Sequence, residues 1–212
     1  DRRDVAALDG AALDLVLFVG DLAGYGPKGA LRVARSIRKL RTPALVMPGN
    51  HDAVSVAQFA AEVFGSPSTL RQVLSIGMEG RVRQLQRALG SVPLCGYSLH
   101  AFERLGITIL AARPHSSGGS RVSYRAYLQR QFGVGSIEDS AARLCALFDA
   151  VPARARVIVL AHNGPRGLGE TRDAIFGCDF RPEAGDWGDP DLEQALAYAA
   201  QSGKRVLAVV AG

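Results

Sequence analysis

Short apolar runs that alternate with helical patterns constrain the fold of this chain more than any other feature of its sequence. The runs cover residues 13–20, 43–48, 106–112, 156–161 and 205–211. The first, LDLVLFVG, has the continuous apolar character of a strand buried on both faces. We predict that all five are strands, and that strands alternating with helices form a single α/β domain over residues 1–212.

Apolar periodicity and end signals predict the helices between these strands. Residues 27–40 carry an apolar stripe at helical spacing, and residues 56–90 are expected to form helix in two pieces. Ser136 is a candidate N-cap for a later helix. Asp189 is a candidate N-cap for the last helix, and Gly203 is predicted to lie just past its end.

Composition narrows the class of protein further. The chain has 212 residues, 48% apolar and 21% charged, which is ordinary for a globular domain with a real core. No apolar run approaches the length of a bilayer span, so we expect no membrane partner. The three cysteines are odd in number and far apart in the sequence, which favours a reducing compartment. We expect the cytoplasm, or the plastid stroma if the chain comes from a plant or alga.

The net charge of +5 comes from scattered arginines rather than a dense basic cluster. This pattern is typical of a solvated basic surface, and we do not expect a nucleic-acid partner. Nothing in the sequence indicates an oligomeric state.

Polar side chains that can bind metal or catalyse follow three of the predicted strands. They are Asp21 after the first, Asn50, His51 and Asp52 after the second, and His162 and Asn163 after the fourth. Ligands of open α/β sheets bind at the carboxyl ends of the strands, so parallel neighbours would bring these groups together.

The residue types also agree with one another. Carboxylate and amide oxygens together with imidazole nitrogens suit a divalent metal such as Mn²⁺, Zn²⁺ or Fe. Two such ions about 3.5–4 Å apart can clamp a phosphoryl group and activate a water. Each residue alone has an ordinary explanation as a cap or turn residue, and the combination is what predicts a metal site.

The segments FVGD, PGNHD and LAHNGP follow predicted strands in the order of three motifs of the calcineurin-like metallophosphoesterases, and the chain resembles that superfamily. LDLVLFVGD, RPHSSGGS, FGVGSIEDSAARL, LAHNGPRGLG and GDWGDPDL are similar to a group of cyanobacterial and chloroplast phosphoesterases. The implied fold is a four-layer α/β/β/α sandwich of two mixed sheets. The D-x-H and G-H-x-H motifs of the superfamily are absent, so we expect a fragment truncated at both ends.

The resemblance implies a role for each matched residue. Asp21 would bridge two divalent metal ions (Mn, Fe or Zn), and Asn50 and His162 would bind the second of them. His51 would contact the phosphate and protonate the leaving oxygen, which is worth roughly 10²–10⁴-fold in rate. Asp52 would hold the His51 imidazole in orientation.

Two further residues are candidates for substrate binding, Arg113 and Asn163. Arg113 follows a predicted strand and could clamp a phosphate through its planar fork, but a structural ion pair is an equally open explanation. The expected function is metal-dependent hydrolysis of a small phosphate ester. The alternatives are a module that binds phosphorylated ligands or metal without turnover, and a metal-dependent nuclease.

Overall fold

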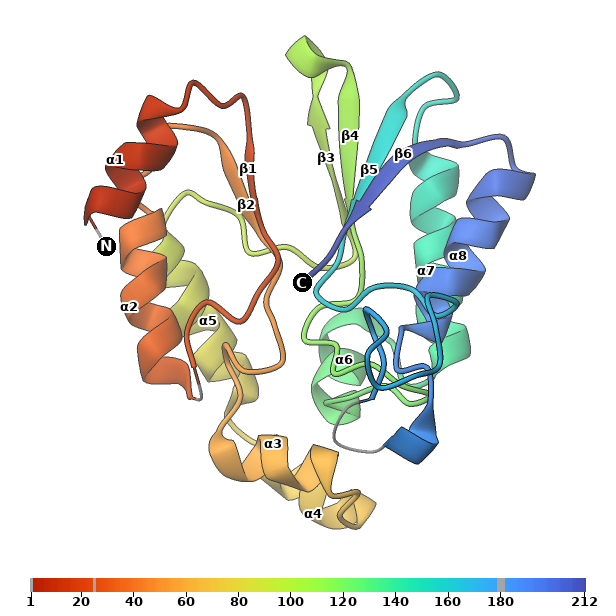
Figure 1. Cartoon of the computed structure of the whole chain (residues 1–212). Coiled ribbons are helices and arrows are strands. Elements are labelled where there is room, and N and C mark those ends of the chain that lie inside the picture. Colours follow the sequence, from red (N-terminus) through yellow and green to blue (C-terminus); the bar gives the residue numbers. More distant parts are fainter. Residues whose placement is uncertain (1, 25, 179–181) are drawn as a thin grey trace. The chain divides into compact units, whose positions relative to one another are not determined.

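The computed structural model describes residues 2–24, 26–178 and 182–212, and it is mixed α/β (Figure 1). It divides into two compact units, Asp1–Cys95 and Gly96–Gly212. Within the described residues each unit holds one β-sheet, a pair of strands in the first and a mixed sheet in the second. The α/β class is therefore confirmed, while a single domain over residues 1–212 stays a prediction.

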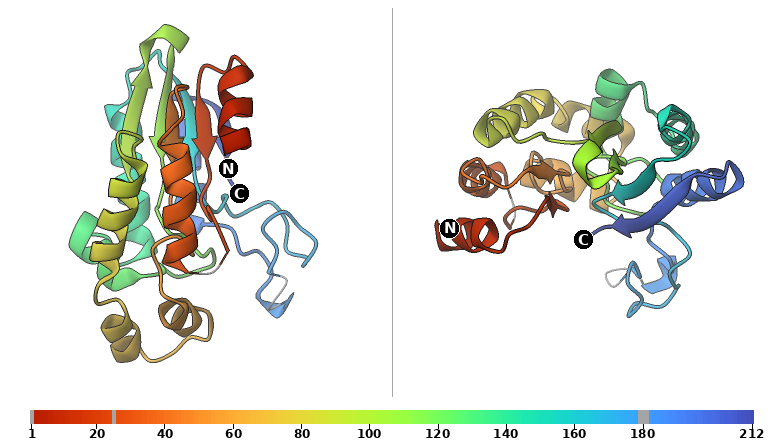
Figure 2. Two further views of the ribbon diagram at one scale, coloured as in Figure 1. Left: turned by 90° about the vertical axis from the view of Figure 1, so that its left-hand side faces the viewer. Right: turned by 90° about the horizontal axis from the view of Figure 1, so that it is seen from above.

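The first unit contains a parallel strand pair covered by helices. In chain order its elements are α1 (Arg2–Gly10), β1 (Val16–Phe18), α2 (Pro27–Ile37), β2 (Ala44–Val46), α3 (Val56–Val63), α4 (Ser68–Leu74) and α5 (Met78–Leu89). Val16 lies opposite Ala44, and Phe18 lies opposite Val46. Figure 2 shows α2 and α5 side by side.

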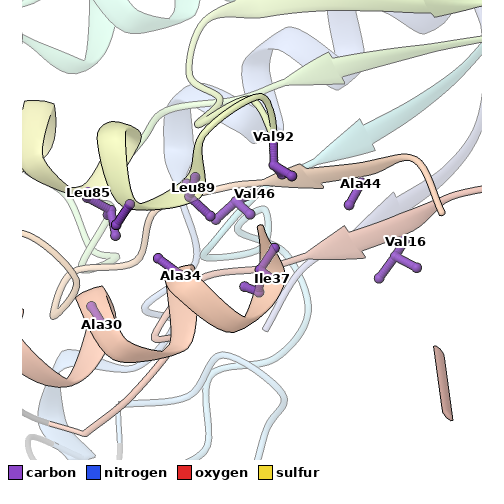
Figure 3. Close-up of a cluster of buried hydrophobic side chains, with 10 residues drawn as sticks. Val16, Ala30, Ala34, Ile37, Ala44, Val46, Leu85, Leu89 and Val92 are labelled. Carbon is purple, nitrogen blue, oxygen red and sulfur yellow. The ribbon is translucent and has the colours of Figure 1, made fainter. Parts of the chain in front are cut away.

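The core of this unit lies where β1, β2, α2 and α5 meet (Figure 3). Its buried members are Val16, Ala30, Ala34, Ile37, Ala44, Val46, Leu85, Ala88, Leu89 and Val92. The stripe expected in residues 27–40 supplies three of them, all from α2. Burial of each large aliphatic side chain contributes about 1.5–3 kcal/mol, so this cluster fixes the two strands against the helices.

Residues 56–90 form three helices rather than the two pieces that we expected. Gly65 adopts a positive φ of 65° and is followed two residues later by Pro67, the N-cap residue of α4. Gly77, with φ of 83°, separates α4 from α5. Both glycines sit in the left-handed region, which ends a helix because an ordinary side chain avoids it.

The second unit is built on a sheet with strand order β3-β4-β5-β6. Its elements are β3 (Ser98–Phe102), η1 (Glu103–Leu105), β4 (Ile107–Ala111), α6 (Arg125–Phe132), α7 (Ile137–Ala150), β5 (Arg156–Leu160), η2 (Pro182–Ala184), α8 (Pro190–Gln201) and β6 (Arg205–Val210). β3 pairs antiparallel with β4, and the remaining pairs are parallel. Figure 1 shows α7 and α8 packed side by side.

The helix end signals of this unit were predicted in part. Ser136 caps α7 as expected, because its hydroxyl accepts the Asp139 N–H at 3.1 Å. Gly203 follows α8 with φ of 68°, which confirms the predicted end. Asp189 occupies the N-cap position of α8 as predicted, but its carboxylate accepts from the buried Arg113 and makes no side-chain hydrogen bond to the helix N–H groups. No helix in the described part of the chain is both long and apolar enough to cross a membrane.

Candidate functional site

The loops after β1 and β2 bring Asp21, Asn50, His51 and Asp52 together. The two strands are parallel neighbours, so their carboxyl ends lie at the same edge. The His51 N–H donates to Asp21 Oδ1 at 3.1 Å, which links the end of one loop directly to the other. The first unit therefore places four of the predicted site residues in one cluster.

Asp21 adopts a backbone conformation that most residues avoid. Its φ is 48°, in the left-handed region, where aspartate is tolerated better than bulkier residues. Residues held in this region often belong to functional sites, because the surrounding structure must compensate for the strain. Its side chain is 39% exposed, so the carboxylate remains open to a ligand.

Gly49 allows the second loop to approach Asp21. A Cβ atom added at Gly49 would overlap both the backbone nitrogen and the carboxylate of Asp21. Only glycine permits this contact, which gives a physical reason for the glycine in PGNHD.

The amide of Asn50 faces the Asp21 carboxylate. Its terminal atom lies 3.2 Å from both Oδ1 and Oδ2 of Asp21. With the NH₂ group turned inward, Asn50 donates a hydrogen bond to each oxygen. With its own oxygen turned inward, three oxygens share one face, which is a suitable donor set for a divalent cation. The inward NH₂ satisfies both side chains, and metal binding by either residue stays a prediction.

His51 contacts two side chains of the first unit. Its Nε2 lies 3.8 Å from Asp21 Oδ2, and its imidazole packs at a tilt against the Phe59 ring with centroids 4.3 Å apart. The side chain is 16% exposed, so it remains accessible at one edge. A histidine held in this way can present a ring nitrogen to a ligand at Asp21.

Asp52 ties the two loops together through backbone bonds. It is buried, its Oδ1 accepts the Leu22 N–H and its Oδ2 accepts the Gly49 N–H, both at 2.8 Å. Hydrogen bonds to an ionised carboxylate are stronger than neutral ones, so Asp52 stabilises the loop that carries Asp21. Its predicted role of orienting the His51 imidazole stays a prediction.

His162 and Asn163 lie in the second unit, directly after β5. His162 is buried, and its backbone carbonyl accepts the Gly212 N–H at 3.0 Å. The Asn163 amide donates to the Trp187 carbonyl and to Asp189 Oδ1, each at 3.2 Å. These bonds fix the turn that follows β5. Metal binding by His162 and substrate binding by Asn163 stay predictions.

Arg113 belongs to a buried ion-pair network. Its guanidinium donates to Asp189 Oδ1 at 2.7 Å, and its Nε lies 3.0 Å from Asp191 Oδ2. All three side chains are almost fully buried. Of the two explanations offered by the sequence, the structure shows the ion pair, and a phosphate contact by Arg113 stays a prediction.

The sequence did not point to the other members of this network. Ser116 donates to Asp189 Oδ1 at 2.7 Å, and Ser140 donates to Asp191 while contacting the Tyr97 hydroxyl at 2.6 Å. Burial raises the pKa of Asp189 to about 7, and the Arg113 charge opposes that rise. The DPD segment at residues 189–191 was a signal for this network, because it places two carboxylates at the start of a helix that needs only one N-cap residue.

Across residues 2–24, 26–178 and 182–212, no group of three or more His, Cys, Asp or Glu side chains is arranged to hold a metal ion. The predicted ligand set includes an amide, that of Asn50, which lies outside these four residue types. Metal binding by Asp21 and Asn50 therefore stays a prediction.

No model of a known protein family matches the chain, and a search of curated proteins finds no match.

Proposed function

We propose that this chain is part of a calcineurin-like metallophosphoesterase that hydrolyses phosphate esters with two divalent metal ions. The observation that carries the proposal is the cluster after β1 and β2, where the Asn50 amide lies 3.2 Å from the Asp21 carboxylate and the His51 N–H donates to Asp21 Oδ1. The close approach at Gly49 supports it, because a Cβ atom there would overlap Asp21.

Each residue of the cluster has a defined task in this proposal. When bound, two ions such as Mn²⁺, Fe or Zn²⁺ would polarise the phosphoryl group and lower the pKa of a water. Asp21 and Asn50 would hold these ions, because carboxylate and amide oxygens are suitable ligands for them. His51 binds the phosphate and gives a proton to the leaving oxygen.

His162 completes the set within this chain as a ligand of the second ion. The D-x-H and G-H-x-H motifs that the resemblance requires do not occur in these 212 residues. We therefore expect the 212-residue chain alone to bind metal weakly and to hydrolyse esters slowly. The motifs should be sought in the full-length gene product.

The proposal includes the four-layer α/β/β/α sandwich. Each unit contributes a sheet and helices, with α2 and α5 against β1 and β2 in the first and α8 against β6 in the second. The carboxyl ends of β1, β2 and β5 carry the proposed ligands, as expected for open α/β sheets.

Hydrolysis of p-nitrophenyl phosphate and of its bis-ester by the full-length gene product tests the proposal. We expect Mn²⁺ to stimulate turnover, Asp21→Ala to abolish it and His51→Ala to lower it by about 10²–10⁴-fold. Asp14→Ala, an exposed aspartate of the same unit, is the matched control and should leave turnover unchanged. Unchanged turnover in Asp21→Ala would refute the assignment. Mn²⁺ binding without hydrolysis in the wild type would favour a binding module instead.

A further inference from the structure

The Phe59 ring is the aromatic neighbour of His51 in the first unit. The two ring centroids lie 4.3 Å apart with the planes inclined at 40°. Phe59 lies in the second turn of α3, whereas His51 lies in the loop that precedes that helix. Both side chains are half-buried, so the contact lies at the border between the protein interior and solvent.

The position of Phe59 is set by a helix that is fixed at its first turn. The Ser55 hydroxyl accepts the Gln58 N–H and so caps α3. Arg81 of α5 donates to the Ala53 carbonyl at 2.8 Å and to Gln58 Oε1 at 2.7 Å. Gln58 itself is buried, so its amide cannot exchange this partner for water without cost.

A histidine that donates a proton must have its ring orientation restrained, and its own side-chain torsions do not provide this restraint. The χ2 torsion of histidine is broad, because it joins an sp³ and an sp² carbon. A donor must nevertheless stay within hydrogen-bond reach of the atom that receives its proton. The carboxylate at Asp21 approaches one nitrogen of the ring, and the Phe59 ring restricts rotation by packing against the imidazole.

We propose that Phe59 is a positioning residue that holds His51 ready to protonate the leaving oxygen of a phosphate ester. This inference rests on the proposed phosphoesterase function. In the step concerned, water forms the new P–O bond, the old P–O bond breaks with its electron pair on the leaving oxygen, and that oxygen takes the proton from the imidazolium. In this proposal Phe59 acts through the orientation of the His51 ring.

The leaving-group dependence of hydrolysis distinguishes positioning from a merely structural role. In the full-length gene product with Mn²⁺, Phe59→Leu should lower kcat for phenyl phosphate, whose poor leaving group needs the proton, by about tenfold or more. The kcat for p-nitrophenyl phosphate, whose leaving group departs without help, should fall far less, and KM should stay the same for both. Phe59→Tyr retains the ring and should behave as the wild type.

Phe64→Leu provides a matched control. This exposed phenylalanine at the C-cap of α3 undergoes the same chemical change and should leave both rates unaffected. An equal loss for both esters in Phe59→Leu, or none, would overturn the inference. If the wild type hydrolyses neither ester, the proposed phosphoesterase function fails instead.

A second measurement needs no Phe59 variant and remains decisive if Phe59→Leu does not fold. In the NMR spectrum of the metal-free full-length protein, the His51 ring protons should show an upfield ring-current shift. His51→Asn assigns these signals by their disappearance. Signals at ordinary positions would contradict the packing of the two rings and overturn the proposal.

Discussion

Asp52→Ala should destabilise the first unit more than a typical substitution. The change removes the shared acceptor of two backbone N–H groups, those of Leu22 and Gly49, each bonded at 2.8 Å. A hydrogen bond to a charged group contributes about 1.5–3 kcal/mol, so losing both predicts a fall of about 3–6 kcal/mol in the free energy of unfolding. The carboxylate is buried, so water cannot readily take its place.

Urea denaturation followed by circular dichroism measures this loss as a lower midpoint. Hydrogen exchange locates it, because the Leu22 and Gly49 amides should exchange faster in Asp52→Ala than in the wild type. Asp52→Asn keeps one acceptor oxygen and should lose about half as much. The exposed Asp14→Ala is the control and should stay within about 0.5 kcal/mol of the wild type. A loss below about 1 kcal/mol, with both amides still protected, would refute the role given to Asp52.

Three further predictions concern the loop contact and the buried network. Gly49→Ala should lower the free energy of unfolding by about 1–3 kcal/mol and weaken Mn²⁺ binding, because its Cβ would overlap Asp21. Gly80→Ala in α5, where the space is open, is the control and should raise the free energy of unfolding by about 0.5–1 kcal/mol. Equal melting temperatures for the two variants would contradict this. Above about pH 7, where Asp189 is ionised, Arg113→Met leaves the Asp189 and Asp191 carboxylates buried without their cation and should cost about 3–5 kcal/mol by urea denaturation. A change within experimental error would speak against the ion pair. Burial raises the pKa of Asp189 from 3.8 to about 7. Between these two pH values the folded state keeps a proton that the unfolded state has released. The free energy of unfolding should therefore fall as the pH rises from about 4 to about 7. Urea midpoints across that range should show a shallower slope in Asp189→Asn, and identical slopes would rule out the raised pKa.

The cluster of the first unit was predictable because it depends on local order in the sequence. β1 and β2 are short apolar runs separated by a helix, and parallel pairing places Asp21 and Asn50 at the same edge. The partners of Asp52 were not predictable, since they are backbone N–H groups whose direction depends on loop conformation. The Phe59 contact was hidden for a similar reason, because its distance from His51 depends on the path of the chain between them.

In the second unit the sequence did not predict the partner of Asp189 or the strand β3, because tertiary contacts outweigh the local signals there. Asp189 has the position and residue type of an N-cap, but the buried charge of Arg113 attracts its carboxylate more strongly than the helix N–H groups do. β3 was missed because its residues are half-buried at the edge of the sheet and do not form a continuous apolar run.

Calorimetric titration of the full-length gene product with Mn²⁺ tests most directly whether Asp21 and Asn50 hold metal. We predict two bound ions per chain in the wild type, loss of both in Asp21→Ala, and weaker binding of one in Asn50→Ala, with Asp14→Ala unchanged. Equal affinity and stoichiometry in the wild type and Asp21→Ala would contradict the account.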